Sequence, residues 1–140
     1  KMKIYSKIKP KSLLHLVYRL EDFNSREDIA PVEEFLQLAS LRLDSGKTFL
    51  PHKHIEKPIN YTSTIAQESW VVIKGSVDVH FYDLDDSFLR TETLKAGDCS
   101  MTFRGGHTYS ILEDNTFVYE FKTGPYEGQA LDKKHIDPKH

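Results

Sequence analysis

Two histidines, His52 and His54, stand two residues apart, shortly after Gly46. Side chains at positions i and i+2 of a β-strand leave the same face, so both imidazoles would converge on one point if this segment is extended. Imidazole nitrogen is a good ligand for first-row transition metals. The pair therefore predicts half of a metal site, which needs further ligands from later in the chain.

The segments that would position such ligands have the patterns of short β-strands. Residues 76–82 alternate with period two, and the acidic turn 83–87 joins them to residues 88–94, which predicts a hairpin. Further strands are expected over residues 35–43, 62–74, 99–103, 107–112 and 116–122, separated by turns rich in Gly, Asp and Asn. This spacing predicts an all-β sandwich or closed barrel.

The N-terminal segment is less regular. Residues 13–20 fit either a strand or a short helix, and residues 28–34 fit a single helical turn. Residues 56–61 are polar, contain Pro58 and predict a loop. After residue 124 the tail is charged, and we expect it to be irregular or to pack over the mouth of a barrel.

Length and composition limit the classes of protein to consider. The chain has 140 residues, which fits a single domain, and its net charge of −2 does not favour nucleic-acid binding. The apolar runs are too short to span a membrane, and no apolar region follows the N-terminus, so we expect no membrane segment and no signal peptide. Cys99 is the single cysteine, which fits a reducing cytoplasm, and we expect a cytoplasmic location.

Two stretches of the sequence resemble the paired motifs of the cupin superfamily. The first has Gly46, His52, His54, Glu68 and Gly75 in the order of the family pattern Gly-x5-His-x-His-x3-4-Glu-x6-Gly. The second, residues 97–107, is similar to Gly-x5-Pro-x-Gly-x2-His-x3-Asn. The resemblance implies a cupin-type double-stranded β-helix, or jelly-roll barrel. We expect one domain over residues 1–140, with a barrel over about 35–122, extra strands in an N-terminal extension (1–34), and a tail (123–140).

The resemblance also implies a set of metal ligands, namely His52, His54, Glu68 and His107. Three imidazoles and one carboxylate suit a divalent transition metal such as Mn, Fe, Ni or Zn. The chain departs from the family pattern in three ways. Thirteen residues separate His54 from Glu68, His107 arrives one residue early after Phe103 in place of proline, and Ile111 replaces the asparagine. A shift of one residue reverses the facing of a strand, and Gly105 and Gly106 offer the backbone freedom to absorb it.

Glu56 is an alternative carboxylate ligand. If the strand continues past His54, then His52, His54 and Glu56 all lie on one face. Glu68 is preferred because its spacing to Gly75 matches the family motif, and the choice between the two stays open.

Other side chains are candidates for chemistry within the same strands. Glu120 and Tyr109 are possible acid/base groups, although a solvent-facing or space-filling role fits them about as well. Trp70 shares the face of Glu68 and is a candidate for binding substrate, with core packing as the alternative. Arg104 is a candidate for binding an anionic group of the substrate, with an exposed loop position as the alternative.

These features predict a small cupin metalloprotein. The leading hypothesis is a metal-dependent isomerase or epimerase acting on a small polar metabolite such as a sugar derivative, because small cupins with similar tails accompany enzymes of sugar nucleotides and surface polysaccharides. The alternatives are an iron-dependent dioxygenase and a non-catalytic module that binds a sugar or other small ligand. We also expect a homodimer, since exposed sheet edges need covering.

Overall fold

The computed structural model describes residues 1–61 and 63–137, and antiparallel strands dominate it. The ten strands are β1 (Met2–Tyr5), β2 (Leu13–Tyr18), β3 (Arg26–Asp28), β4 (Ala39–Leu41), β5 (Glu68–Lys74), β6 (Ser76–Tyr82), β7 (Phe88–Lys95), β8 (Cys99–Thr102), β9 (Gly106–Ile111) and β10 (Phe117–Lys122). A 3₁₀ turn (Leu20–Asp22) and a short helix, α1 (Gln129–Asp132), complete the elements of the described chain.

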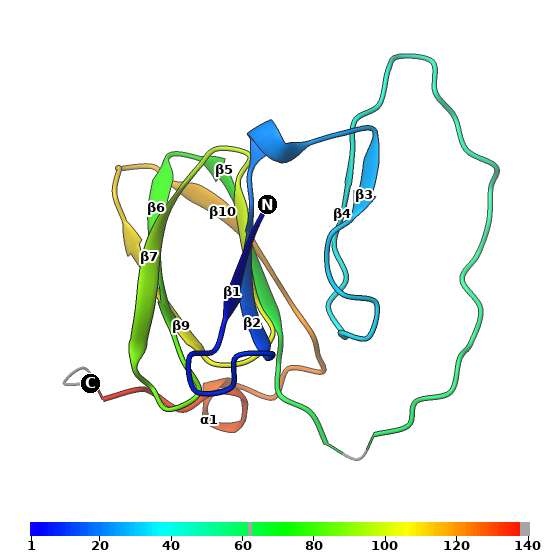
Figure 1. The fold of residues 1–140 in the computed structure, drawn as a ribbon. Helices are drawn as coiled ribbons and strands as arrows, with labels where there is room; N and C mark the ends of the chain where they lie inside the picture. The colour runs from blue at the N-terminus through cyan, green and yellow to red at the C-terminus, as the bar shows by residue number, and fades with distance from the viewer. Residues whose placement is uncertain (62, 138–140) are drawn as a thin grey trace.

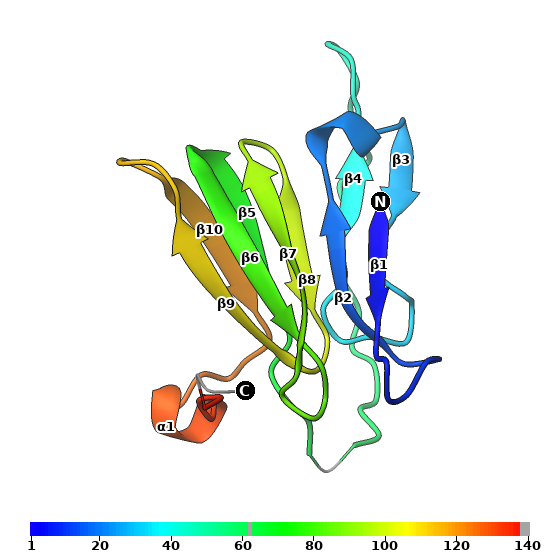
Figure 2. The same cartoon turned by 60° about the vertical axis from the view of Figure 1, so that its left-hand side comes forward.

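The strands form two facing sheets and a small outer ribbon (Figures 1 and 2). One sheet has the order β1-β2-β8-β5-β10, the second has the order β7-β6-β9, and β3 pairs with β4 in the ribbon. All pairings are antiparallel. Among the described residues the sheets do not close into a barrel, so the arrangement is a sandwich.

Apolar side chains fill the space between the two sheets at one end. Alternate residues of β6 point inward, and Val77, Val79 and Phe81 are completely buried against Val17 and Val72 of the larger sheet. The period-two alternation of residues 76–82 therefore decides which face of β6 lies in the core. The same strands carry polar side chains toward the opposite end of the sandwich.

A second apolar cluster lies on the outer face of the larger sheet. Leu16, Met101 and Phe103 point away from the sandwich interior and pack against Ile29 and Ala30 of the N-terminal segment. The N-terminal third thus supplies both strands of the sheet and a cover for its outer face, and it buries surface that would otherwise be exposed.

Most of the predicted strands are present. The hairpin of β6 and β7 is confirmed, as are the strands ending near residues 102, 111 and 122, and residues 13–18 form a strand rather than a helix. The strand predicted over residues 35–43 is reduced to β4. No helix covers residues 28–34, where a helical turn was predicted, but the N–H of Glu34 donates to the carbonyl oxygen of Pro31 at 3.0 Å and closes a single turn. Thr62, at the start of the strand predicted over 62–74, and residues 138–140 of the predicted tail lie outside the described residues.

Residues 42–61 and 63–67 have no regular secondary structure, and most of this segment extends away from the sandwich, as Figure 1 shows. It returns to the sandwich at Gln67, which is buried. The expectation that residues 52–54 form a strand was wrong in this structure, because no neighbouring strand supplies partners for their backbone. The loop predicted over residues 56–61 is confirmed as part of this longer loop.

The outer face of β10 carries an exposed aromatic row formed by Phe117, Tyr119 and Phe121. Such a row on an edge strand is a surface that a second chain can cover, and the homodimer stays a prediction. No helix in the described part of the chain is long and apolar enough to cross a membrane.

Gly105 is a position where alanine should be costly. Its φ is +82°, and an added Cβ would lie 2.7 Å from the carbonyl oxygen of Tyr82 and 3.3 Å from Nε2 of His15. We expect Gly105→Ala to lower the free energy of unfolding by about 3 kcal/mol, measured by urea denaturation. Gly46→Ala is the matched control, because Gly46 has a φ of +89° with no atom near its Cβ position, and it should cost about 1 kcal/mol. Equal losses would contradict the proposed clash.

Candidate active site

Strand register places a row of polar side chains across the inner face of the larger sheet. His15 of β2 pairs with Thr102 of β8, Thr102 pairs with Glu68 of β5, and Glu68 pairs with Lys122 of β10. Directly paired residues point to the same side of a sheet. Four groups that are far apart in sequence therefore lie side by side on the inner face.

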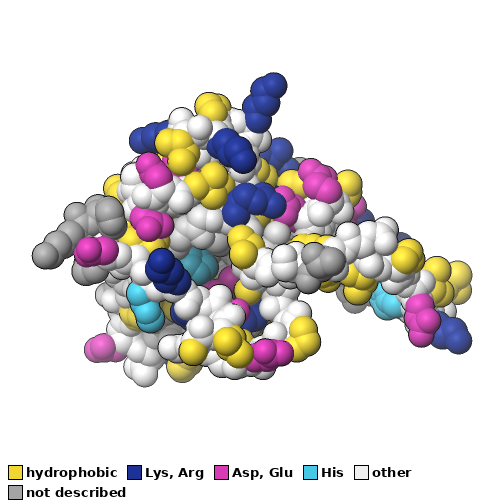
Figure 3. All heavy atoms as spheres, turned by 90° about the horizontal axis from the view of Figure 1, so that it is seen from below, with side chains coloured by type: hydrophobic (Ala, Val, Ile, Leu, Met, Phe, Trp, Pro, Cys, Tyr) yellow, Lys and Arg dark blue, Asp and Glu magenta, His cyan; other side chains and the backbone are white. Residues whose placement is uncertain are grey.

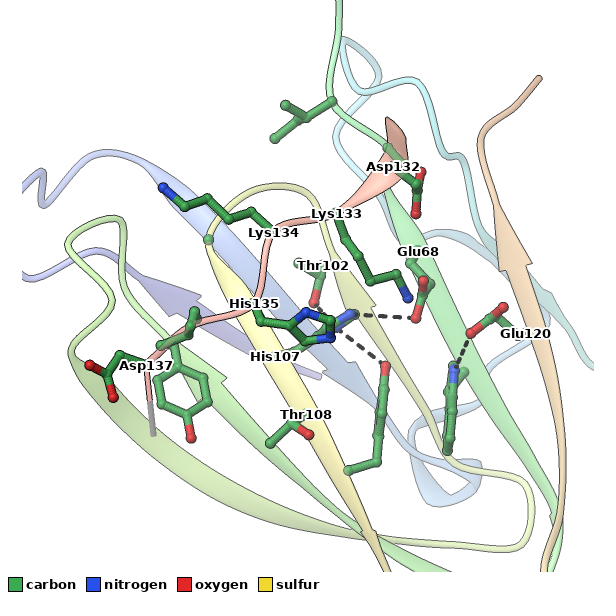
Figure 4. Close-up of a pocket in the computed structure, with 17 residues that line it drawn as sticks. Glu68, Thr102, His107, Thr108, Glu120, Asp132, Lys133, Lys134, His135 and Asp137 are labelled. Carbon is green, nitrogen blue, oxygen red and sulfur yellow. Dashed lines mark hydrogen bonds and ion pairs between the residues drawn. The ribbon is translucent and has the colours of Figure 1, made fainter. Parts of the chain in front are cut away.

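The facing sheet adds His107 and Tyr109 of β9. His107 points toward this row (Figure 4), and the hydroxyl of Tyr109 lies 3.3 Å from Nδ1 of His107. Phe81 of β6 pairs with His107, and both point inward. Two residues before His107, Gly105 has a φ of +82°, a conformation that glycine adopts without steric cost. The role expected for the paired glycines stays a prediction.

Glu68 and Thr102 of this row, with His107 and Tyr109, line a cavity of about 630 Å³ at the end of the sandwich that is not filled by the apolar core. His15 and Lys122 lie behind this lining, in contact with Thr102 and Glu68 respectively. The tail crosses this end, and Asp132, Lys133 and Ile136 contribute to the lining. This position agrees with the expectation that the tail packs over one end of the strands. Figure 3 views the molecule from this end, where acidic, basic and histidine side chains gather on the body while the loop before β5 extends to one side. The volume is within the range of small-molecule sites.

Glu68 and His107 form the centre of the cavity. Oε1 of Glu68 lies 3.4 Å from Nε2 of His107, and Nζ of Lys122 lies 3.6 Å from Oε2 of Glu68. Burial, followed by the nearby charge of Glu120, raises the pKa of Glu68. Burial, followed by the charge of Lys133, lowers the pKa of His107 to about 4. The pair therefore favours a neutral imidazole beside a carboxyl that holds its proton more strongly than usual.

Glu120 differs from Glu68 although the two carboxyls share one cavity. Burial opposes ionisation of Glu120, but the indole N–H of Trp70 donates a hydrogen bond to its Oε1 at 2.9 Å, and Lys122 lies 3.6 Å from Oε2. These contacts lower the pKa of Glu120. Two carboxyls whose environments shift them in opposite directions are typical of acid/base sites.

An aromatic pair forms one wall. Trp70 and Tyr109 stack with their ring centroids 3.6 Å apart and their planes within 2° of parallel. Burial raises the pKa of Tyr109, so its hydroxyl stays protonated. Trp70 lines the cavity and also packs against the apolar core, and its role in binding substrate stays a prediction.

The structure separates the four predicted metal ligands into two pairs. Glu68 and His107 meet in the cavity, whereas His52 and His54 lie exposed on the loop before β5, with ring centroids 5.6 Å apart and Nδ1 of His52 3.0 Å from the carbonyl oxygen of Leu50. Glu56 lies exposed on the same loop. Within residues 1–61 and 63–137, no three His, Cys, Asp or Glu side chains are placed to hold a metal ion. The observed arrangement thus does not fit a four-ligand centre.

Arg104 lies outside the cavity lining. Its guanidinium donates to both carboxylate oxygens of Glu34, at 2.9 and 3.1 Å, and to the carbonyl oxygen of Leu13 at 3.0 Å. These bonds attach the N-terminal segment to the end of β8. The structure therefore gives Arg104 a bonded structural position and does not bring it to the predicted substrate site.

Sequence reasoning missed four members of this site. Strand register brings Thr102 into the lining and places His15 and Lys122 in contact with Thr102 and Glu68, while Lys133 enters the lining from the tail. Alternation gave a usable indication only for Lys122, which shares its strand face with Glu120. Comparisons with protein families, with characterised proteins and with solved structures gave no match to this chain.

The buried histidines predict a loss of stability in acid. The pKa of His15 and that of His107 are both lowered from 6.5 to about 4 by burial. Between these values the unfolded chain binds protons that the native state does not, so the free energy of unfolding falls as pH drops. Each histidine contributes a slope of up to about 1.4 kcal/mol per pH unit.

Urea unfolding at successive pH values measures this slope. His107→Gln should remove the share of the slope due to His107. His80→Gln is the control, because His80 bonds to Thr91 and Ser110 on the outer face of the smaller sheet. An unchanged slope in His107→Gln would show that this imidazole is not held neutral.

Proposed function

We propose that the cavity catalyses proton transfer on a small polar metabolite such as a sugar derivative, in an isomerase or epimerase type of reaction. The observation that carries this proposal is the contact between Glu68 and His107, 3.4 Å apart inside a cavity of about 630 Å³. One partner is suited to donate a proton and the other to accept one.

The two groups support each other during an aldose–ketose type of step. Nε2 of His107 takes the proton from the carbon next to a carbonyl, while Glu68 gives its proton to the carbonyl oxygen, and an enediol forms. Loss of the Glu68 proton creates a carboxylate beside the new imidazolium, which raises the proton affinity of His107. His107 then delivers its proton to the former carbonyl carbon, while the Glu68 carboxylate takes the proton of the neighbouring hydroxyl, which becomes the new carbonyl. Both side chains thereby return to their starting protonation states.

The walls of the cavity suit a polyhydroxylated substrate. The flat pair of Trp70 and Tyr109 offers an aromatic surface, and Lys133 and Glu120 offer charged hydrogen-bonding groups. A concave site with a few convergent polar groups is typical of small-molecule binding.

We also propose that the chain has a cupin-type fold. What supports this is the order β2-β8-β5-β10 facing β7-β6-β9, and the positive φ of Gly75, Gly97 and Gly105 at glycine positions of the two motifs. The proposal concerns the fold, and a fold alone does not assign a reaction.

A metal-dependent reaction is the second candidate function. The free edge of β9 favours it, since β9 ends the smaller sheet and carries His107. Residues 47–55 would have to join that edge for His52 and His54 to approach Glu68 and His107, and a bound metal would polarise a substrate oxygen.

Exchange of carbon-bound hydrogen tests the acid/base proposal. In D₂O, the protein should incorporate deuterium next to the carbonyl of at least one member of a panel of aldoses, ketoses and keto sugars, as read by NMR. Glu68→Gln and His107→Gln should each lower the rate by at least about 100-fold. Glu56→Gln is the control and should leave the rate unchanged. Incorporation that survives in Glu68→Gln would reject the assigned pair, and absence of incorporation across the panel would count against the reaction class.

Metal content tests the second candidate. After loading with Mn²⁺ or Zn²⁺ and removal of free ion, elemental analysis should find stoichiometric metal in the wild type and in Glu56→Ala, and little in His54→Ala or Glu68→Ala, because the resemblance assigns ligation to the last two residues. Absence of metal from the wild type, or its retention in His54→Ala, would contradict the four-ligand centre.

A further inference from the structure

A buried chain of hydrogen bonds runs from the backbone of β6 to the cavity. Nε2 of His15 lies 2.9 Å from the carbonyl oxygen of Tyr82, and Nδ1 of His15 lies 3.0 Å from Oγ1 of Thr102. The same hydroxyl oxygen lies 2.8 Å from Nδ1 of His107. His15 is completely buried, so no solvent competes for these bonds.

The carbonyl at one end sets the direction of the chain. A carbonyl oxygen only accepts hydrogen bonds, so Nε2 of His15 carries a proton and donates to Tyr82. A fully buried imidazole disfavours a second proton, and burial lowers the pKa of His15 to about 4. Nδ1 of His15 is therefore the acceptor in the neutral ring.

The remaining protons follow from this choice. Thr102 has one hydroxyl proton, which it donates to Nδ1 of His15, so its oxygen is left to accept from Nδ1 of His107. A neutral His107 then has its single proton on Nδ1. Its Nε2 is left with a lone pair, which points toward Glu68 in the cavity.

Two other contacts favour the opposite tautomer, but both are longer. Tyr109 has its hydroxyl 3.3 Å from Nδ1 of His107 and would donate there if that nitrogen were bare. An ionised Glu68 would prefer a proton on Nε2, at 3.4 Å. The contact to Thr102, at 2.8 Å, is near the ideal length, whereas the other two lie beyond it.

We propose that His15 and Thr102 are positioning residues that hold neutral His107 in the tautomer with its proton on Nδ1 and a bare Nε2 facing the cavity. Gly105 keeps space for the start of this chain, because a Cβ there would crowd both the Tyr82 carbonyl oxygen and Nε2 of His15. The catalytic value of the tautomer rests on the proposed function, because Nε2 is the atom assigned to take the substrate proton. The tautomer itself does not depend on any reaction.

Long-range ¹H–¹⁵N NMR of the uniformly ¹⁵N-labelled chain at neutral pH reads the protonation of each ring nitrogen, and His107→Gln assigns the resonances. In the wild type we expect Nδ1 of His107 to be protonated and Nε2 to be bare. Thr102→Val removes the acceptor and frees Tyr109 to donate, so the proton should move to Nε2. Thr102→Ser keeps the hydroxyl and should retain the wild-type pattern.

His15→Phe is a second variant that leaves Thr102 in place. It keeps a planar ring against Phe81, whose centroid lies 4.6 Å from that of His15, and it frees the Thr102 hydroxyl to donate to His107. The proton should again move to Nε2, while the His80 resonances stay unchanged as an internal reference. If Thr102→Val does not fold, the His107 tautomer measured in His15→Phe decides whether the proposal stands.

A wild-type His107 protonated on Nε2 would overturn the proposal. The same holds if Thr102→Val or His15→Phe keeps the wild-type tautomer of His107. The expected NMR pattern together with no deuterium exchange would leave the positioning roles standing and reject the reaction. Exchange with the opposite tautomer would keep the reaction class but reject the positioning roles and the assignment of Nε2 as the base, so the two failures are distinguishable.

Discussion

Buried polar side chains on the inner face of the larger sheet impose the constraint on which the rest of this structure depends. His15, Thr102 and Glu68 lie where a β-sandwich is ordinarily apolar, and a buried polar group left without a partner costs roughly 1–3 kcal/mol. The contact of Thr102 with both imidazoles depends on the register of β8 against β2. A slip of one residue in β8 would send Thr102 to the outer face and remove its hydroxyl from Nδ1 of His15 and Nδ1 of His107.

Burial of the apolar core offsets the free-energy cost of this polar arrangement and fixes its position between the sheets. Val72, Val77 and Val79 fill one end of the space between the sheets, and the cavity begins where such residues stop. Burial of each large apolar side chain contributes about 1.5–3 kcal/mol, which offsets the desolvation of the polar groups. The cavity is therefore held by strands that are already anchored at their other ends.

Unequal surroundings give similar groups different chemistry. Glu68 and Glu120 lie on neighbouring strands and both contact Lys122, yet their pKa values shift in opposite directions. Greater burial raises the pKa of Glu68, whereas the hydrogen bond from the Trp70 indole lowers the pKa of Glu120. The same logic applies to the histidines, since a backbone carbonyl at one end of a hydrogen-bonded chain fixes which nitrogen of His107 faces the cavity.

The sequence by itself determined the all-β class and the hairpin of β6 and β7, because alternation and turn residues act over a few neighbouring positions. It left open which way His107 faces, because the motif places that histidine one residue early. It could not decide whether residues 52–54 join a sheet, since an edge strand needs a partner that local pattern does not name. Tertiary structure alone decided that Lys133 and His15 belong to the site: the tail and the strand register bring them there, and neither residue has a local pattern that indicates chemistry.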